Sequence, residues 1–385
     1  MLKNMFCKIM SIKQTLVTNL KNIPGAKTKR KLVVIYVDDY GSIRVKNKEA
    51  YENLLKAGLA VDKTRYGYDT LCTTEDLQML FEVLTSVKDC KGHHAVFTPL
   101  ANIANPDFDK IRKTGYCQYY REPFTHTMER LGSAYDGAYD LWKQGITEGI
   151  FRPEYHGTEH VSVWKLMKAL REKHRSTMVS FENDSVASPF FPDEPRIANA
   201  TAVFDVVKAS DNEPLKDDIR VGLDMFERLL GYRATQFTPG AGIYSPSLHS
   251  CLKECGITGI HVNRNKAYPL GDGVYSKQFL YLGKRNNMGQ HYIVRNCPFE
   301  PFADNRARNS SAVSVCLDNI DAAFRWHAPA MISTHRVNFA GAIEPTHRNQ
   351  SLNDLRELLT EIVKRWPDAE FVSGADMLNV LFKGK

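Results

Sequence analysis

The sequence predicts an α/β protein whose parallel strands close into a barrel. Short apolar, β-branched runs alternate with longer helical patterns along most of the chain, and polar residues directly follow several of these runs. Such alternation is typical of a parallel sheet covered by helices, and this many units favour a closed or nearly closed barrel. A chain of 385 residues is long enough for one barrel of this kind or for two ordinary domains.

The candidate strands are short runs rich in Val, Ile, Phe and Thr, a composition typical of strands buried on both faces. In chain order they are Leu32–Val37, Ala95–Thr98, Thr177–Phe181, Ala234–Phe237, Thr258–Val262, Tyr292–Val294, Ala330–Ser333 and Glu370–Val372. Helical patterns lie between them at about 75–88, 134–145, 162–174, 217–230, 246–255, 318–327 and 351–366. Thr74, Ser245 and Ser351 are suitable N-terminal caps, and Gly256 is a suitable C-terminal cap.

The chain divides into an N-terminal helical extension over residues 1–30 and a catalytic barrel over residues 31–385. Within the extension, Ile9–Leu20 has an amphipathic pattern that suits packing on the barrel or, as the alternative, on a membrane surface. Two loop insertions are expected, at about 100–131 and 182–214, because neither region shows a regular pattern. Tyr116, Tyr119 and Tyr120 in the first insertion could stack on sugar rings in the barrel mouth or pin the loop to the barrel.

Composition restricts the class of protein. Hydrophobic residues make up 43% and charged residues 25% of the chain, and the net charge of +7 is scattered rather than clustered. No nucleic-acid-binding motif is visible, and the basic surface suits an acidic glycan or no particular partner. The eight cysteines form no C-x-x-C pair, which predicts reduced thiols, and lysines interrupt every apolar run near the N-terminus. We therefore expect a cytoplasmic protein without a signal peptide or transmembrane segment, and find no signal for an oligomeric state.

Two short segments far apart in the chain suggest a metal site. Asp38 and Asp39 directly follow the first candidate strand, and His156 and His160 are four residues apart after a Phe-Arg-Pro stretch. One aspartate and two histidines can hold a divalent ion and leave coordination positions open for water and substrate. The remaining aspartate is then free to act as a base, as in a metal-assisted hydrolase.

Other polar motifs occupy equivalent positions along the chain. Thr238-Pro239-Gly240-Ala241-Gly242 follows the candidate strand at 234–237, and Thr334-His335-Arg336 follows that at 330–333. In a parallel barrel the carboxyl ends of all strands open onto one face, where catalytic groups collect. The joint placement of these motifs therefore favours a functional site over isolated core residues.

These motifs resemble those of the polysaccharide deacetylases with NodB homology, carbohydrate esterase family 4. The shared features are Asp38-Asp39, the H-x-x-x-H segment from His156 to His160, the Arg-Pro stretch and the late Ser-Thr-His335. The resemblance implies a distorted (β/α) barrel of the glycoside hydrolase/deacetylase type that acts on amide bonds of an acetylated sugar or glycan. It also implies that Asp38 is the base, His335 the general acid, and Asp39, His156 and His160 the metal ligands. Zinc is the expected ion, with iron, cobalt, nickel or manganese as alternatives.

The chain departs from the family pattern in its third and fourth motifs. The third motif of the family contains an arginine that orients the base, and here the matching stretch around Gly240, Ala241 and Gly242 has none. Arg336 or Arg295 could supply this charge from a neighbouring strand end. Asn296 to Phe302, with Glu300, is the nearest match to the fourth motif, and the Gly240–Gly242 turn could offer a backbone N–H to an oxyanion.

Three functions are compatible with these residues. The first is a metal-dependent deacetylase of sugars, favoured by the complete set of Asp38, Asp39, His156, His160 and His335. The second is a non-catalytic barrel that binds a glycan, favoured by the missing arginine. The third is an amidohydrolase or phosphoesterase on a non-sugar substrate, because such enzymes use similar metal ligands.

Overall fold

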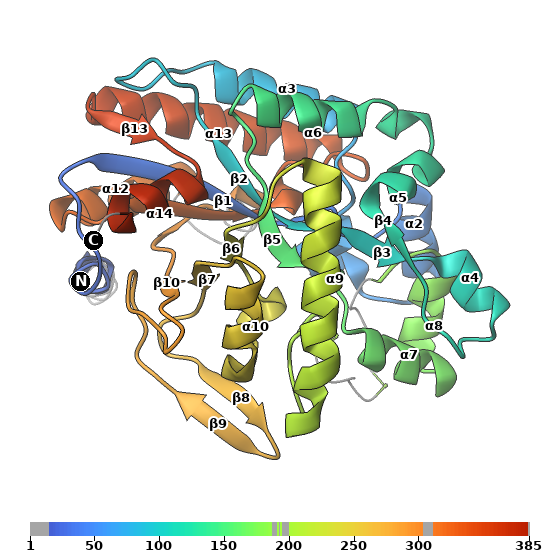
Figure 1. Ribbon diagram of the computed structural model, residues 1–385. Coiled ribbons are helices and arrows are strands. Elements are labelled where there is room, and N and C mark those ends of the chain that lie inside the picture. The colour runs from blue at the N-terminus through green and yellow to red at the C-terminus, as the bar shows by residue number, and fades with distance from the viewer. Residues whose placement is uncertain (1–14, 187–190, 192, 195–199, 303–310, 384–385) are drawn as a thin grey trace, which may run out of the picture.

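A computed structural model describes residues 15–186, 191, 193–194, 200–302 and 311–383. Its main sheet is parallel, in the order β10-β7-β6-β5-β2-β1-β12-β11, and β13 extends the β2 side of β1 (Figure 1). The strands are β1 (Lys31–Tyr40), β2 (Phe97–Asn102), β5 (Glu154–Gly157), β6 (Gln236–Phe237), β7 (Gly259–His261), β10 (His291–Ile293), β11 (Cys297–Pro298), β12 (Ala330–His335) and β13 (Ala369–Phe371).

The sheet curls into a distorted barrel. Its two end strands, β10 and β11, are separated in the chain by residues 294–296 alone. A link of this length spans at most about 14 Å, so the two edges of the sheet must approach each other. The expected distorted (β/α) barrel is therefore confirmed.

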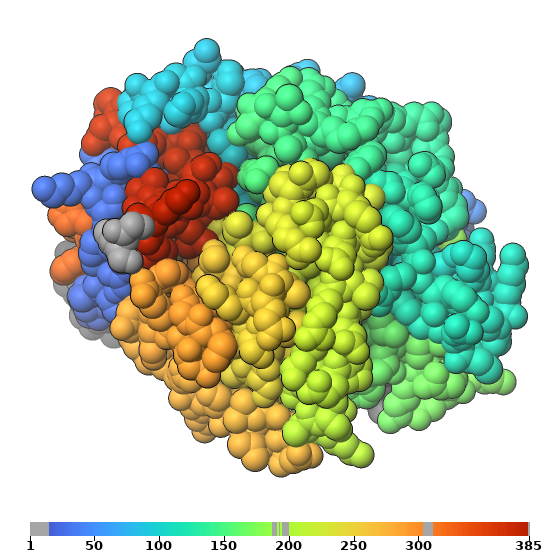
Figure 2. Space-filling view, in the orientation of Figure 1, coloured from blue at the N-terminus to red at the C-terminus, as the bar shows by residue number. Residues whose placement is uncertain are grey.

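Helices cover the outside of this barrel. They are α2 (Lys48–Lys56), α3 (Thr74–Thr85), α4 (Phe108–Lys113), α5 (Phe124–Leu131), α6 (Ala138–Thr147), α7 (Val163–Arg171), α8 (Arg175–Glu182), α9 (Asn212–Leu230), α10 (His249–Glu254), α12 (Ala312–Arg325), α13 (Pro345–Arg365) and α14 (Gly374–Phe382). In Figure 2, α9, α10 and α14 cover the face turned to the viewer and hide the sheet behind them. In the described part of the chain, no helix is both long and apolar enough to cross a membrane.

Alternate residues of strand β1 belong to two different apolar clusters. Val33, Ile35 and Val37 belong to the large apolar cluster beneath the outer helices. Leu32, Val34 and Tyr36 belong to a second cluster together with Met377, Leu378 and Leu381 of α14. Because side chains alternate along a strand, residues with even numbers on β1 face the barrel interior, and Asp38 continues that series.

One predicted strand is wrong, and two strands of the main sheet, β5 and β11, were missed. Residues Thr177–Phe181, expected as a strand because they form a short apolar run with β-branched residues, lie in helix α8, where the buried residues Ser176, Ser180 and Phe181 share one side. Phe181 packs on Phe108 of α4, with ring centroids 4.8 Å apart. Of the missed strands, β5 is short and polar, and β11 has two residues, so neither gave an apolar run.

The expected irregular insertions also contain regular structure. Residues 100–131 hold α4, α5 and the hairpin of β3 (Ala104–Pro106) and β4 (Arg121–Pro123). A second hairpin, β8 (Ala267–Gly271) with β9 (Val274–Lys277), was not predicted and projects at the lower edge of Figure 1. Part of the 182–214 region lies outside the described residues, and the rest leads through a short 3-10 helix at Ala209–Asp211 into α9.

The described part of the N-terminal extension lies on the barrel through polar residues. Residues 15–20 are helical, Thr18 and Asn22 are buried, and Lys21 donates hydrogen bonds to the Asn296 carbonyl (2.5 Å) and to the Asn319 side chain. Leu16, Val17 and Leu20 remain at least half exposed. The first half of the predicted helix over Ile9–Leu20, residues 9–14, lies outside the described residues.

Candidate active site

Asp38 and Asp39 leave the end of β1 in different directions. Both carboxylates are buried, with exposed fractions of 4% and 2%. Asp38 faces the barrel interior, whereas Asp39 has a φ of +77°, which breaks the alternation of the strand. The Asp39 carbonyl accepts hydrogen bonds from the Ser42 amide (3.4 Å) and hydroxyl (2.9 Å), and these bonds hold the turn. The two neighbouring carboxylates therefore meet separate sets of partners.

Asp39 meets the two histidines of the H-x-x-x-H segment. Its Oδ1 lies 2.9 Å from His160 Nε2 and 3.4 Å from His156 Nε2, and its Oδ2 lies 3.1 Å from Arg44 Nη2. His156 is on β5, and the turn at Gly157 (φ +113°) brings His160 back beside it, with ring centroids 4.8 Å apart. Three residues distant in sequence thus converge at one point of the barrel mouth.

Hydrogen bonds fix the orientation of His156. Asn102 on β2 donates to the His156 and Gly157 carbonyls, both at 3.2 Å. His156 Nδ1 lies 2.7 Å from the Thr238 carbonyl after β6, so this nitrogen carries the proton and donates. Nε2 then keeps its lone pair and is directed towards Asp39.

Asp39, His156 and His160 fit a divalent metal ion. One donor atom from each residue lies within 4.8 Å of the others. The buried Nε2 of His156 has no hydrogen-bond partner among the described residues, and a buried nitrogen of this kind is rare unless it serves a ligand. Burial, together with the charge of Arg44, lowers the pKa of His160 to about 4 and keeps that imidazole neutral. One carboxylate and two imidazoles are a donor set suited to zinc and its neighbours in the periodic table.

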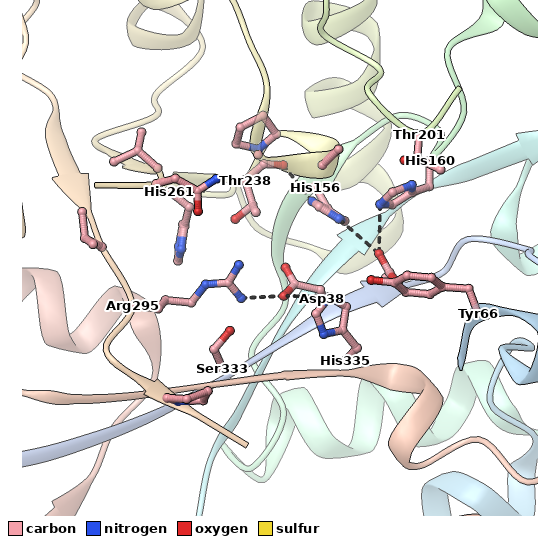
Figure 3. A pocket seen from close by; sticks show the side chains of 18 of the residues that line it. Asp38, Tyr66, His156, His160, Thr201, Thr238, His261, Arg295, Ser333 and His335 are labelled. Atoms are coloured by element: carbon pink, nitrogen blue, oxygen red, sulfur yellow. Dashed lines mark hydrogen bonds and ion pairs between the residues drawn. The ribbon is translucent and has the colours of Figure 1, made fainter. Parts of the chain in front are cut away.

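Asp38 meets a different pair of cationic groups. Arg295 Nη1 lies 2.5 Å from Asp38 Oδ2, and His335 Nε2 lies 3.9 Å from the same oxygen. Burial would raise the pKa of Asp38, but the charges of Arg295 and His335 outweigh burial and hold this pKa below its ordinary value. Figure 3 shows Asp38 between Arg295 and His335. Asp38 is therefore an ionised carboxylate directed into the barrel mouth.

His335 is held by an acidic partner on its other side. Its Nδ1 contacts Glu300 Oε1, and Glu300 is fixed in turn by Arg65 (2.9 Å) and by the Asn338 amide (2.9 Å). Burial would lower the pKa of His335, but the charges of Glu300 and Asp38 outweigh burial and raise this pKa above its ordinary value. The charged imidazolium carries its second proton on Nε2, on the side of Asp38.

One cavity of about 830 Å³ lies at the carboxyl ends of the strands, where we expected the site. It is lined by Asp38, Asp39, His156, His160, Arg295 and His335. Ala241 and Gly242 of the expected turn also line it. The turn is a single 3-10 unit over Gly240–Gly242 in which the Gly242 amide donates to the Pro239 carbonyl (2.9 Å). The Gly242 N–H is thus already occupied within the turn.

Six of the predicted residues do not line this cavity: Glu300 and Gly240 lie next to the lining residues His335 and Ala241, and Arg336 and the three tyrosines lie elsewhere. Arg336 is fully buried, and its guanidinium pairs with Asp69 (2.9 Å) and the Ser42 carbonyl (2.6 Å), so it supports the fold behind the site. Of the two arginines considered as replacements for the motif arginine, Arg295 is the one that contacts Asp38.

The three tyrosines of the first insertion also lie elsewhere. They pack on the apolar cluster around Phe108, Ile111 and Phe181, and none lines the cavity of Asp38. The Tyr119 hydroxyl donates to Glu159 (3.0 Å). Our expectation of an aromatic wall over the barrel mouth is corrected, because these rings bury apolar surface that fixes the insertion to the barrel.

Sequence reasoning missed several residues at the cavity, among them His261, Arg44 and Tyr66. His261 is the last residue of β7, so the rule that polar residues at strand ends gather at the mouth could have identified it. Arg44 and Tyr66 come from loops, and Arg44 lies 4.8 Å over the Tyr66 ring. No motif or strand end marks either of them in the sequence.

This fold and site define a parallel barrel with a candidate metal site at its carboxyl face. A protein of Parabacteroides distasonis, assigned as a glycoside hydrolase/deacetylase, has the same fold, with a TM-score of 0.52 at 9% identity over 94% of this chain and 74% of that chain. This similarity shows the barrel type alone.

More distant similarities extend to named deacetylases. A protein of Mycobacterium smegmatis assigned as a polysaccharide deacetylase gives a TM-score of 0.45 at 11% identity, over 93% of this chain and 94% of that one. A pseudoenzyme of carbohydrate esterase family 4 from Bacillus anthracis gives 0.35 at 8% identity, over 91% of this chain and 66% of that one. No protein-family model matches the sequence, and no curated protein matches it.

Proposed function

We propose that this protein is a metal-dependent deacetylase that releases acetate from an acetylated amino sugar or glycan. The observation that carries this proposal is the separation of the two adjacent carboxylates. Asp39 lies with His156 and His160, and Asp38 lies with Arg295 and His335, at the mouth of one cavity. A metal-assisted hydrolase needs this division between a group that binds the ion and a group that moves protons.

Asp39, His156 and His160 would hold the ion, and zinc is the ion we propose. When bound, a divalent ion supplies positive charge that polarises a carbonyl and acidifies a water molecule. Arg44 keeps the Asp39 carboxylate ionised: burial raises its pKa, but the charge of Arg44 and the contact with His160 Nε2 hold this pKa well below the ordinary value. The Thr238 carbonyl keeps His156 in the tautomer that presents Nε2.

Asp38 and His335 would move the protons of the reaction. As the oxygen of the attacking water bonds to the acetyl carbon, the Asp38 carboxylate accepts the water proton. As the carbon–nitrogen bond breaks, the imidazolium of His335 gives its Nε2 proton to the departing nitrogen, so that acetate and a free amine result. The two groups are 3.9 Å apart and can serve the same tetrahedral centre. The backbone amides of the turn at Gly240–Ala241 are the candidate oxyanion donors.

Acetate release from N-acetylated hexosamines and their oligomers tests this function. We expect release by the zinc-loaded protein, loss of release after dialysis against a chelator, and recovery when zinc is restored. Asp38→Asn should bind substrate without turnover. A loaded wild-type protein that binds the sugars and releases no acetate would contradict the proposal and support a non-catalytic glycan-binding barrel. Turnover of non-sugar amides alone would support an amidohydrolase.

A further inference from the structure

Two cations, Lys21 and Arg264, form a wall of the cavity that the proposed chemistry does not use. Arg264 follows β7 by three residues, and its Nη2 donates to the Lys21 carbonyl (2.6 Å). The Lys21 ammonium donates in turn to the Asn296 carbonyl, one residue beyond Arg295. The N-terminal segment thus completes the cavity on the side where β10 leads into β11.

This wall lies on the other side of the cavity from the candidate metal ligands. Figure 3 shows His261 and Arg295 on one side of Asp38, and His160 and Tyr66 on the other. Lys21 and Arg264 are neighbours of the first pair, since Arg264 follows His261 and Lys21 contacts the segment after Arg295. A ligand that extends from the ion site past Asp38 would therefore reach Lys21 and Arg264.

The lining charges of the cavity do not balance. Its lysine and arginine residues are Lys21, Arg44, Arg264 and Arg295, and its carboxylates are Asp38 and Asp39. Arg44 pairs with Asp39, and Arg295 pairs with Asp38. Among the residues that the structure describes, no carboxylate lies within the 4.0 Å of an ion pair from Lys21 or Arg264. The two unpaired cations both belong to the same wall.

Partial burial makes this lack of carboxylates significant. Burial lowers the pKa of Lys21 and also that of Arg264, and no adjacent carboxylate offsets it. The Nη1 atom of Arg264 is buried and has no hydrogen-bond partner within the described chain. Desolvated cations in proteins are ordinarily paired with anions, and arginine in particular suits carboxylate and phosphate groups. Because the partners of Lys21 and Arg264 are neutral carbonyl groups, the positive charge of this wall is not compensated.

We propose that Lys21 and Arg264 bind an anionic group, a carboxylate or a phosphate, on the acetylated substrate. This inference rests on the proposed deacetylase function and names its substrate class: an acetylated sugar that carries negative charge. The cavity volume of about 830 Å³ admits such a sugar. The anion would anchor one end of the substrate while the acetyl group lies at Asp38 and the ion site.

Substrate pairs that differ only in charge test the proposal. We would measure kcat/KM for acetate release from a neutral N-acetylhexosamine, from its uronic acid and from its phosphate ester, with wild type, Lys21→Gln and Arg264→Gln. Arg171→Gln, an exposed site on α7, is the matched control. Wild type should prefer one anionic substrate by at least about tenfold, and that substrate identifies carboxylate or phosphate as the recognised group. Each cavity variant should lose about 10- to 100-fold on it, the range for a hydrogen bond to a charged group, and change little on the neutral sugar.

Binding separates failure of this inference from failure of the proposed function. Calorimetric binding of the uronic acid and of the phosphate ester to wild type and Arg264→Gln requires no turnover. Arg264-dependent binding without acetate release would uphold the anion site and remove the deacetylase proposal. Equal kcat/KM for neutral and anionic sugars, unchanged in both cavity variants, would overturn the anion site and leave the deacetylase standing. Equal losses on neutral and anionic sugars would also overturn it, and Lys21→Gln provides the second test if Arg264→Gln does not fold.

Discussion

Replacing Arg295 by glutamine removes the cation in contact with the proposed base. The Arg295–Asp38 contact is 2.5 Å long, and the Asp38 side chain is 6% exposed, so solvent screens it little. A hydrogen bond to a charged group contributes about 1.5–3 kcal/mol, and about 1.4 kcal/mol corresponds to one unit of pKa. Arg295→Gln should therefore raise the pKa of Asp38 by about one to two units.

The pH profile of kcat/KM measures this change. A base is active only when deprotonated, so the acidic limb of the profile follows the pKa of Asp38 and should move up by about one to two units in Arg295→Gln. The loss in rate should be large near pH 5 and smaller near pH 8. Arg295→Lys, which keeps the charge, should recover part of the acidic limb, and metal content should not change. A uniform loss at every pH, with the limb in its original place, would refute the reasoning that Arg295 acts on the charge of Asp38.

Three further predictions address the remaining groups. Glu300→Gln should lower the raised pKa of His335; because a general acid must be protonated, the alkaline limb should move to lower pH, and an unmoved limb would contradict this role. Arg336→Leu leaves the buried Asp69 carboxylate without its main partner and should lower the free energy of unfolding, measured with urea, by about 3–5 kcal/mol. Unchanged stability together with lost activity would contradict this and indicate that Arg336 acts on the substrate. His156→Ala should abolish stoichiometric zinc binding, measured by elemental analysis, while circular dichroism remains native; unchanged zinc would exclude this site.

Most of the site could be predicted from the sequence, because its residues directly follow recognisable strands. Asp38 and His335 follow apolar, β-branched runs that could be recognised as strands, and β1 and β12 are in fact paired in register at these two residues. Their proximity is a direct consequence of parallel pairing. The barrel class followed from the same alternation of strands and helices.

The parts that could not be predicted depend on tertiary contacts. The short run Thr177–Phe181 has the composition of a strand, yet it lies in helix α8, where Phe181 packs on Phe108. β5 is polar because its ends serve the site, and Glu154 accepts the backbone amides of Thr235 and Gln236 (2.7 and 2.8 Å) to hold it in the sheet. Hydrophobic periodicity predicts a strand only where one of its faces is apolar, and β5 has no apolar face.

The partners of the charged side chains were the other feature that the sequence did not predict. From the sequence, Arg295 and Arg336 were equally suitable replacements for the motif arginine. The fold distinguishes them, because Arg295 contacts Asp38 and Arg336 contacts Asp69. Likewise, Lys21 lies 275 residues from its partner Asn296 in the chain. No local pattern encodes such pairs, because they depend on how the N-terminal segment and the barrel meet.

The central claim is that one of two adjacent aspartates holds a metal ion while the other moves protons. Acetate released per bound metal ion, measured for Asp38→Asn and Asp39→Asn beside wild type, tests it most directly. We predict that Asp38→Asn keeps one ion per chain and releases about 10²–10⁴-fold less acetate per ion, whereas Asp39→Asn loses most of its metal. If Asp39→Asn kept its ion and Asp38→Asn lost it, the two roles would be exchanged. If both variants matched wild type per bound ion, the proposed hydrolytic centre would be contradicted.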